Sequence, residues 1–360
     1  MQEADTETGD SKARILIRLP NWVGDVVMAL PAVGELRRIF SASHISLAGK
    51  PWVLGLFDGE ELADDVIPLS DTAGHVNRLA ALFNEISSIR RGKFNLAVLL
   101  TNSFGTAMAA RLGGATRIAG YATDGRRLLI NQVIPFEPEY KKLHQTRYYL
   151  NIAAHVEDSI AGKSLVNFDR AEPRMMVSEL QKQQARSKLQ HFGIQGDAPI
   201  LAINPGATNS TAKRWPAERF AAAADRLTER AGFQTIIVGA PGDKTVADQV
   251  AHFMRTRPAI LAGETSIAEL KGVLACAALV ISNDTGTAHV SAALGIPTVV
   301  VFGPTEHVST RPLSHRAVVV RHEVECSPCM LRECPIDHRC MTRVEVDDVY
   351  TAAQNLVANV

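Results

Sequence analysis

The sequence predicts an α/β protein of two domains, each built around a parallel β-sheet. Three observations support this prediction. Short apolar runs alternate with helical patterns along the chain, the runs are apolar at nearly every position, and the chain has 360 residues, against roughly 150 for one domain. Strands that are apolar on both faces are typical of parallel sheets that helices cover on both sides.

The first half of the chain opens with a strand, a loop and a helix. The strand is Arg14-Ile-Leu-Ile-Arg-Leu19, a loop with Pro20 and Gly24 follows, and apolar residues then recur at helical spacing over 25–39. The same patterns predict further elements in this half, namely strands at 44–48 and 95–100 and a helix over 76–90.

The second half repeats this alternation. Strands are predicted at 200–204, 235–239, 259–261, 279–282 and 298–302, and helices at 217–231, 244–255, 266–275 and 286–294. A charged stretch with Pro173 and Gly193 marks a boundary within 166–198, where 179–191 is the expected first helix of the second domain. We therefore expect a disordered tail at 1–12, an N-terminal domain at 13–170, a C-terminal domain at 171–345 and a last helix at 346–360.

The composition excludes several classes of protein. A 46% hydrophobic content excludes a disordered chain. The 38 basic and 38 acidic side chains cancel, which argues against a protein dominated by nucleic-acid contacts, because phosphate neutralisation needs a basic surplus. No apolar run approaches the roughly 20 residues of a membrane span, and the acidic first ten residues do not resemble a secretory signal. We expect a cytoplasmic protein.

In parallel α/β sheets, ligands bind beyond the carboxyl ends of the strands. The loop after the 200–204 strand combines Gly206, Thr208 and Lys213 with a Pro216 suited to a helix start. A polar loop with a lysine beside a helix is what an anion such as a diphosphate requires. A solvated turn with a surface lysine explains the same residues equally well.

The loop after the 279–282 strand favours a ligand site more clearly. Asp284 and His289 flank the start of a small-residue helix, at which Thr285 and Gly286 would present free backbone N–H groups to an anion. The alternative is that Asp284 or Thr285 only caps the helix.

Two further aspartates follow predicted strands. Asp243 could bind ribose hydroxyls, as acids do in dinucleotide folds, although capping the next helix is the favoured reading. Asp25 could complement the dipole of its helix or accept a proton from a hydroxyl nucleophile. The residues alone do not decide between these roles.

Several motifs in one order give the chain a resemblance to the ADP-heptose:lipopolysaccharide heptosyltransferases, most of all to the type that adds the second heptose. The resemblance runs from Ile15 to about Val357. The motifs that carry it are Asn21-Trp-Val-Gly-Asp25, Thr101-Asn-Ser-Phe104, Gly120-Tyr-Ala-Thr-Asp-Gly-Arg126, Pro205-Gly-Ala207, Ala212-Lys-Arg-Trp-Pro216, Ser282-Asn-Asp-Thr-Gly286 with His289, and Phe302-Gly-Pro-Thr305.

The resemblance implies the GT-B architecture, in which two Rossmann-like domains flank a cleft, and an inverting transfer of heptose that uses no metal and no cofactor. It implies that Asp25 is the general base. On the donor side it assigns the diphosphate to Thr208, Lys213, Thr285 and Gly286, the ribose to Asp243, the adenine to Thr265, and the heptose or diphosphate to Asp284 and His289.

Two motifs depart from the family pattern. Gly105 stands where many relatives carry an arginine, which affects the acceptor contacts. Thr208-Asn-Ser-Thr211 replaces a common glycine-proline, which affects the donor contacts.

The implied acceptor is the heptosyl-Kdo2-lipid A core, a phosphorylated glycolipid. Residues 111–147 contain seven basic and three acidic side chains, a surplus that could steer an anionic lipid or contact an anionic membrane surface. Ordinary solvated faces explain the same surplus. We expect Arg126 and Lys141 to contact the acceptor, and the protein to bind the cytoplasmic face of the inner membrane peripherally.

Four of the five cysteines crowd into one segment, at Cys326, Cys329, Cys334 and Cys340, with His338 among them. These ligand types suit zinc or an iron–sulfur centre. The second pair lacks the CxxC spacing of a zinc ribbon, so structural thiols are favoured over a metal site.

Two other interpretations of the chain remain. One is another GT-B enzyme with a different nucleotide-sugar or acceptor. The other is a non-catalytic nucleotide- or metal-binding module on the same fold. The sequence does not predict the oligomeric state.

Overall fold

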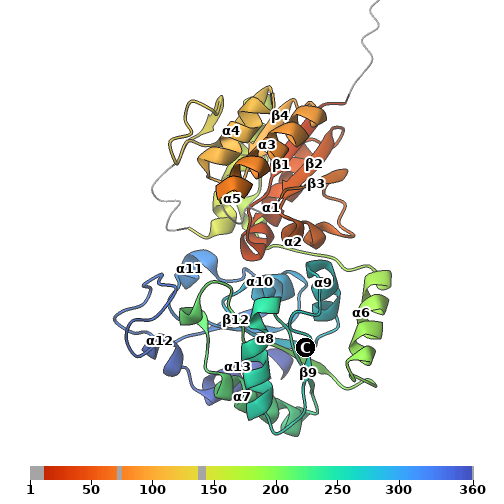
Figure 1. Ribbon diagram of the computed structural model, residues 1–360, viewed down its shortest axis with the longest axis vertical. Helices are drawn as coiled ribbons and strands as arrows, with labels where there is room; N and C mark the ends of the chain where they lie inside the picture. The colour runs from red at the N-terminus through yellow and green to blue at the C-terminus, as the bar shows by residue number, and fades with distance from the viewer. Residues whose placement is uncertain (1–11, 71–74, 137–142, 359–360) are drawn as a thin grey trace, which may run out of the picture.

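The computed structural model describes residues 12–70, 75–136 and 143–358, which form two α/β units stacked along the long axis (Figure 1). The predicted tail, apart from residue 12, lies outside these residues, as does Lys141. Within them, no helix is long and apolar enough to cross a bilayer.

The N-terminal unit holds a sheet of six described strands in the order β3-β2-β1-β4-β5-β6, all of them parallel. Their bounds are β1 Arg14–Arg18, β2 His44–Gly49, β3 Asp65–Pro68, β4 Leu96–Leu99, β5 Arg117–Tyr121 and β6 Gln132–Ile134.

Helices cover both faces of this sheet. Helices α1 and α5 pack together on one face, and α3 and α4 pack on the other. The bounds are α1 Val23–Ile39, α2 Pro51–Leu54, α3 His75–Gly92, α4 Phe104–Leu112 and α5 Gln145–Ala161. The central strands are buried on both sides, which explains why they are apolar at almost every position.

The C-terminal unit repeats the same topology. In the described residues its six parallel strands lie in the order β12-β11-β10-β7-β8-β9. The bounds are β7 Ile200–Asn204, β8 Gln234–Ile237, β9 Ala259–Ile260, β10 Leu279–Asn283, β11 Thr298–Val301 and β12 Ala317–Val320.

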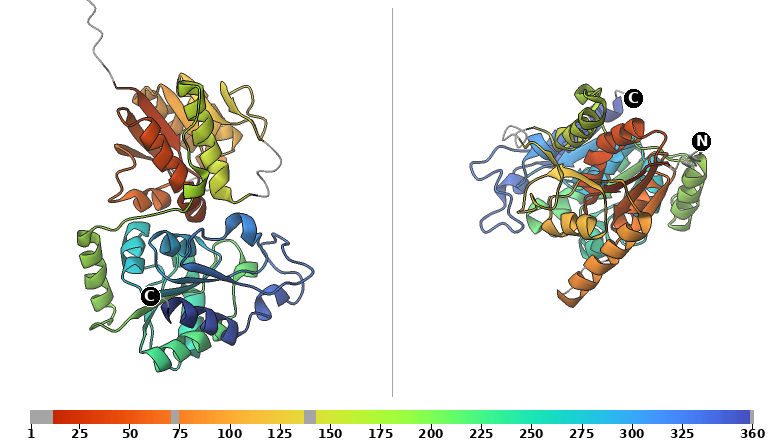
Figure 2. Two further views of the ribbon diagram at one scale, coloured as in Figure 1. Left: turned by 180° about the vertical axis from the view of Figure 1, so that it is seen from behind. Right: turned by 90° about the horizontal axis from the view of Figure 1, so that it is seen from above.

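Helices α7, α8 and α13 cover one face of the second sheet, and α9 and α10 cover the face toward the N-terminal unit (Figures 1 and 2). The bounds are α6 Glu179–His191, α7 Ala217–Ala231, α8 Lys244–Phe253, α9 Ile267–Ala275, α10 Gly286–Ala293, α11 His307–Thr310, α12 Arg339–Thr342 and α13 Val346–Ala358.

The predicted fold class is confirmed. The predicted helices at 179–191 and 217–231 coincide with α6 and α7, while strands β3, β5, β6 and β12 and helices α4 and α5 were not predicted. The shorter of these strands, such as Gln132–Ile134, carry too few apolar residues to stand out from a loop. The two sheets lie on either side of the predicted boundary at 166–198.

Candidate functional site

Three predicted site residues lie where the strand order of a sheet reverses. The reversal falls between β1 and β4 in the first sheet and between β7 and β10 in the second. Asp25 follows β1, Lys213 follows β7 and Asp284 follows β10. Such reversal points leave room for a ligand beyond the strand ends, so the topology places these three side chains at the expected position.

The loop before Asp25 is held from both sides. The Arg18 guanidinium donates to the carbonyl oxygen of Leu19 at 2.5 Å and to Asn21 Oδ1 at 3.3 Å. The Trp52 indole N–H donates to the carbonyl oxygen of Asn21 at 2.9 Å. These bonds fix the loop from which α1 begins, and Asp25 lies in the first turn of that helix.

Two glycines bring the first turn of α1 against α10. A Cβ atom at Gly24 would lie 3.0 Å from His289 Cδ2, and one at Gly286 would lie 2.7 Å from Val23 Cβ. Larger side chains would separate the two helices. The glycines therefore allow the N-terminal unit to meet the C-terminal unit one residue before Asp25, at the boundary seen in Figure 1.

Asp284 is the centre of a polar network on the C-terminal side. Its Oδ2 accepts from Lys213 Nζ at 2.8 Å and from Thr305 Oγ1 at 2.7 Å. The Lys213 side chain remains partly exposed. One positive charge is thus held beside the first residues of α10, where free backbone N–H groups are available to an anion.

Two buried asparagines at strand ends tie these loops together. Asn204 Nδ2 donates to Thr287 Oγ1 at 2.6 Å and to Thr285 Oγ1 at 3.2 Å. Asn283 accepts from the backbone N–H of Trp215 at 2.9 Å and donates to the carbonyl oxygen of Pro205 at 2.8 Å.

The sequence analysis quoted Asn283 and Thr305 only within motifs and assigned no role to them or to Asn204. The signal that could have found the asparagines is an Asn at the carboxyl end of two strands that are otherwise apolar, at Asn204 and Asn283.

Burial shifts the pKa values of two titratable groups at the domain boundary, Asp25 and His289. It raises the pKa of Asp25 to about 6, with Lys213 opposing the rise and Asp284 adding to it. Burial also lowers the pKa of His289 to about 4, although Asp284 opposes this shift. Near neutral pH, Asp25 is therefore an ionised carboxylate poised to take a proton, and His289 is uncharged.

The arrangement combines a proton acceptor on one unit with an anion-binding corner on the other. Asp25 has no hydrogen-bond donor among the described residues, so its oxygens are available to a ligand. A carboxylate with a pKa near the working pH suits general-base catalysis, and a lysine beside a helix start suits a departing phosphate. In the described part of the chain, no group of three or more His, Cys, Asp or Glu side chains could hold a metal ion.

Comparison with known proteins decides the family. The model of glycosyltransferase family 9 (heptosyltransferase) matches residues 83–339. The chain belongs to this family.

Curated relatives resemble this chain along most of its length. Lipopolysaccharide heptosyltransferase 2 of Escherichia coli is 28% identical over 315 residues, which cover 86% of this chain and 88% of that protein. Lipooligosaccharide heptosyltransferase 2 of Campylobacter jejuni is 27% identical over 354 residues, which cover 96% and 99%.

Solved structures share the fold of this heptosyltransferase. The ADP-heptose LPS heptosyltransferase II of E. coli superposes with a TM-score of 0.80 at 23% identity, covering 96% of this chain and 99% of that one. An E. coli heptosyltransferase solved with ADP superposes with a TM-score of 0.69 at 18% identity, covering 95% and 99%. The expected architecture of two Rossmann-like domains is therefore confirmed.

The remaining predicted donor residues, Thr208, Asp243 and Thr265, follow β7, β8 and β9 in turn. Thr208 is exposed in the loop after β7, and Thr265 is half-buried just before α9. Asp243 is buried against Gly206, where a Cβ would lie 2.2 Å from the carboxyl carbon of Asp243. Its Oδ2 accepts from the backbone N–H of Ala240 at 3.1 Å, so the carboxylate caps a short turn and not the following helix α8.

Arg126 does not lie where an acceptor contact requires it. It is fully buried and donates to the carbonyl oxygens of Tyr121 at 2.8 Å and Thr101 at 2.5 Å and to Asn102 Oδ1 at 3.0 Å. In this structure the guanidinium fixes the loops after β4 and β5, and it reaches no surface. The prediction for Lys141 concerns a residue outside the described ones.

The cysteine segment supports the donor loops. All five cysteines are free thiols. Between them, the carbonyl oxygen of Arg332 accepts from the backbone N–H of Ala212 at 3.0 Å, and Ser327 Oγ donates to the carbonyl oxygen of Gly303 at 2.6 Å. Residues 326–340 therefore hold the loops that carry Lys213 and Thr305.

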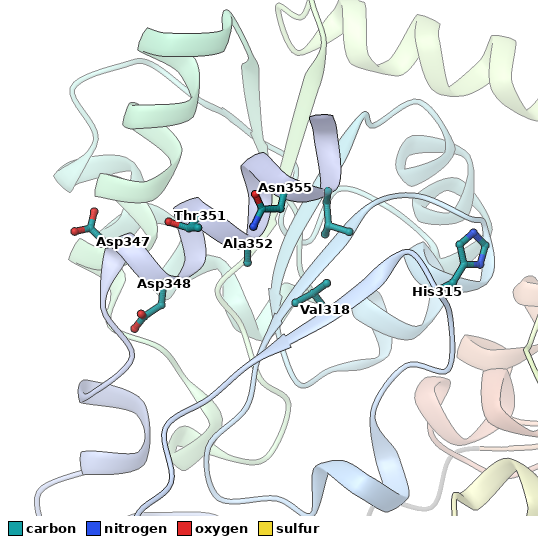
Figure 3. A pocket seen from close by; sticks show the side chains of 8 residues that line it. His315, Val318, Asp347, Asp348, Thr351, Ala352 and Asn355 are labelled. Atoms are coloured by element: carbon teal, nitrogen blue, oxygen red, sulfur yellow. The ribbon is translucent and has the colours of Figure 1, made fainter. Parts of the chain in front are cut away.

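A surface depression between α13 and β12 holds none of the predicted site residues (Figure 3). Its carboxylates have partners of their own, because Asp347 pairs with Arg226 and Asp348 lies 3.2 Å from His322 Nε2. The depression is therefore not part of the site.

Proposed function

We propose that this protein transfers heptose from ADP-heptose onto the inner core of lipopolysaccharide, adding the second heptose to heptosyl-Kdo2-lipid A. Two facts support the proposal. Family 9 membership establishes the enzyme class, and the relatives at 27–28% identity are heptosyltransferases 2. The observation that carries the chemistry is the unpartnered Asp25 carboxylate, whose pKa is raised to about 6, facing Lys213 and α10.

In the proposed reaction, Asp25 takes the proton from the attacking hydroxyl of the acceptor. The acceptor oxygen forms a bond to the anomeric carbon of the heptose from the face opposite ADP. The bond from that carbon to the diphosphate oxygen breaks, and its electron pair leaves with ADP. The configuration of the anomeric carbon is thereby inverted.

The departing diphosphate gains charge, and the C-terminal unit supplies the groups that stabilise it. Lys213 provides a cation, and the backbone N–H groups that follow Thr285 and Gly286 provide donors that need no reorganisation. Thr208, Asp243 and Thr265 would complete the donor contacts to the diphosphate, ribose and adenine. With these groups, the proposed reaction runs without a metal and without a cofactor.

His289 lies against Gly24, the residue before Asp25. Because burial lowers its pKa to about 4, it would contact the heptose or the diphosphate as a neutral imidazole. Asp284 orients Lys213 through the 2.8 Å ion pair. Asp284 is thus a positioning residue for the lysine, and it also faces the donor sugar in this proposal.

The acceptor is a membrane glycolipid, so we propose that the enzyme acts at the cytoplasmic face of the inner membrane without spanning it. A test uses the purified chain with ADP-heptose and either Kdo2-lipid A or its mono-heptosylated form, followed by mass spectrometry. We expect a gain of one heptose on the mono-heptosylated acceptor. Product only from the unheptosylated acceptor would contradict the second-heptose assignment, and no product from either would contradict the function.

A further inference from the structure

The face of the N-terminal unit formed by α3 and α4 is both apolar and basic. Five large apolar side chains are exposed on it: Leu79 and Phe83 on α3, Phe104 and Leu112 on α4, and Leu128 in the loop after β5. Leu79 is 62% exposed, Phe83 67% and Leu128 93%. These elements share one layer, because Leu129, Ile86 and Ala107 pack in the same hydrophobic cluster below them.

The exposed charges on this face are almost all positive. Residues 75–131 contain eight basic and two acidic side chains, although the whole chain is neutral. Of the two acids, Glu85 is paired with Arg18 at 2.9 Å and is largely buried, so Asp124 is the exposed one. The exposed basic side chains in this range are Arg78, Arg90, Arg91, Lys93, Arg111, Arg117 and Arg127. Within the described residues, none of these seven has a carboxylate partner.

The apolar–basic face extends from the start of α3, which lies near the sheet edge that carries Asp25, to Arg90 and Leu112, which lie near the start of β1. Glu85 on α3 pairs with Arg18, the last residue of β1, and Asn84 Nδ2 donates to Ser70 Oγ just beyond β3. Leu79 and Phe83 lie toward the start of α3, beyond that edge. In the view from above, α3 (orange) extends past the rest of its unit (Figure 2).

Such a surface has the chemistry of a membrane-docking site. Leu79 and Phe83 stand four residues apart, so they lie side by side on one face of the helix. Apolar side chains with arginines around them bind an interface by burying the apolar groups among the lipids and attracting anionic headgroups. A single exposed leucine would need no explanation, but an apolar pair on a projecting helix with unpaired arginines does.

We propose that the apolar–basic face binds the anionic phospholipid surface of a membrane, with Leu79 and Phe83 entering the headgroup region. The inference rests on the proposed function to the extent that a glycolipid acceptor makes docking useful. Docking through this face would hold the sheet edge that carries Asp25 toward the membrane. The acceptor hydroxyl would then reach Asp25 without leaving the bilayer.

The test is sedimentation of the full chain with vesicles of phosphatidylethanolamine and phosphatidylglycerol, or of phosphatidylcholine alone. The variant Leu79→Ser/Phe83→Ser removes the apolar pair. Leu180→Ser/Phe253→Ser is the matched control, because these two side chains are 63% and 52% exposed in the C-terminal unit. Arg78→Gln/Arg127→Gln tests the charge. The four substituted side chains on the face are exposed, so the melting temperatures of these variants should match that of the wild type.

We expect the wild type and the control to bind the anionic vesicles, and both face variants to bind at least about tenfold more weakly. Added salt should weaken the binding, because exposed charges are screened. Equal binding by Leu79→Ser/Phe83→Ser and the control would overturn the proposal, as would a wild type that does not bind anionic vesicles. A wild type that forms a dimer and binds no vesicles, with a monomeric Leu79→Ser/Phe83→Ser variant, would show that a second copy occupies the face.

Activity separates this inference from the proposed function. With acceptor dispersed in detergent, Leu79→Ser/Phe83→Ser should transfer heptose as the wild type does, and the loss should occur only with acceptor in vesicles. A wild type that binds vesicles but transfers nothing would contradict the function and leave the docking surface standing.

Discussion

Two of the regions where the units meet differ in how far their charges are satisfied. In the first contact, α9 reaches into the 55–60 loop of the N-terminal unit, where fully buried Lys271 donates to the carbonyl oxygens of Leu56 and Asp58 at 3.0 Å and to Glu60 Oε1 at 2.8 Å. An ammonium group has three donors, so each has a partner.

The second contact is the candidate site, and its charges are incompletely paired. Asp25 carries a raised pKa and no hydrogen-bond donor from the described residues, and Lys213 is partly exposed. This difference in charge pairing indicates that the two contacts have different roles. The Lys271 contact fixes the relative position of the units, whereas the Asp25 contact keeps polar atoms for ligands. Substitutions at the Lys271 contact should therefore lower stability, and substitutions at the Asp25 contact should lower activity or ligand binding.

Among the variants considered, Asp25→Asn should have the largest effect. It should lower the rate of heptose transfer without changing ADP binding. Loss of a general base lowers the rate by about 100- to 10,000-fold, while ADP affinity should stay within about threefold, because Asp25 lies opposite the donor groups. Rate measurements and ADP titration check this. Glu35→Gln, in the same helix, is the control and should act as the wild type. A variant that keeps its turnover would exclude Asp25 as the base.

Lys271→Met should mainly destabilise the fold. Removing Lys271 leaves the buried Glu60 carboxylate without a counter-charge, which costs about 3–5 kcal/mol. Denaturant unfolding measures the loss. Lys182→Met is the control, since its pair with Glu179 is on the surface and is worth about 0.5 kcal/mol or less. Similar losses in the two variants would mean that the Lys271 contact does not hold the units together.

Lys213→Met should weaken ADP binding by about 10- to 100-fold, which corresponds to one charged hydrogen bond of about 1.5–3 kcal/mol. It should also raise the pH at which residual transfer is half-maximal, because Lys213 lowers the pKa of Asp25. Calorimetry and pH profiles give both numbers. Lys244→Met, at an exposed lysine, should change neither. Unchanged ADP affinity in Lys213→Met would count against the diphosphate role.

Gly24→Ala should have a smaller effect, both on the stability of the fold and on the rate of transfer. The added methyl would meet His289 at 3.0 Å, and such overpacking costs about 1–3 kcal/mol and should lower transfer several-fold by moving Asp25. Gly34→Ala in the same helix meets no atom within 4 Å and should stabilise the protein by up to about 1 kcal/mol. Gain of stability in both variants would show that the contact between α1 and α10 is loose.

The sequence predicted the parts of the site that are local. A strand followed by a Gly- or Pro-containing loop identified Asp25, Lys213 and Asp284, because parallel strands place such loops at one edge. It did not predict that Gly24 would meet His289. These residues are 265 positions apart, and the contact depends on how the two units pack.

The burial of individual charged side chains could not be predicted from the sequence. Arg126 was predicted to contact the acceptor because it lies in the basic stretch 111–147, but the strand ends around it provide hydrogen-bond acceptors that only the folded chain assembles. Lys271 gave no signal at all. Its surroundings come from the 55–60 loop, more than 200 residues earlier.

The most direct measurement of the central claim, that Asp25 is the proton acceptor, is the pH dependence of kcat/KM between pH 5 and pH 8. This parameter reports the free enzyme, in which the Asp25 pKa is raised to about 6. Because the base acts only when ionised, we expect full activity above pH 7, half near pH 6 and a fall of about tenfold per unit below that. A flat profile down to pH 5 would contradict the account.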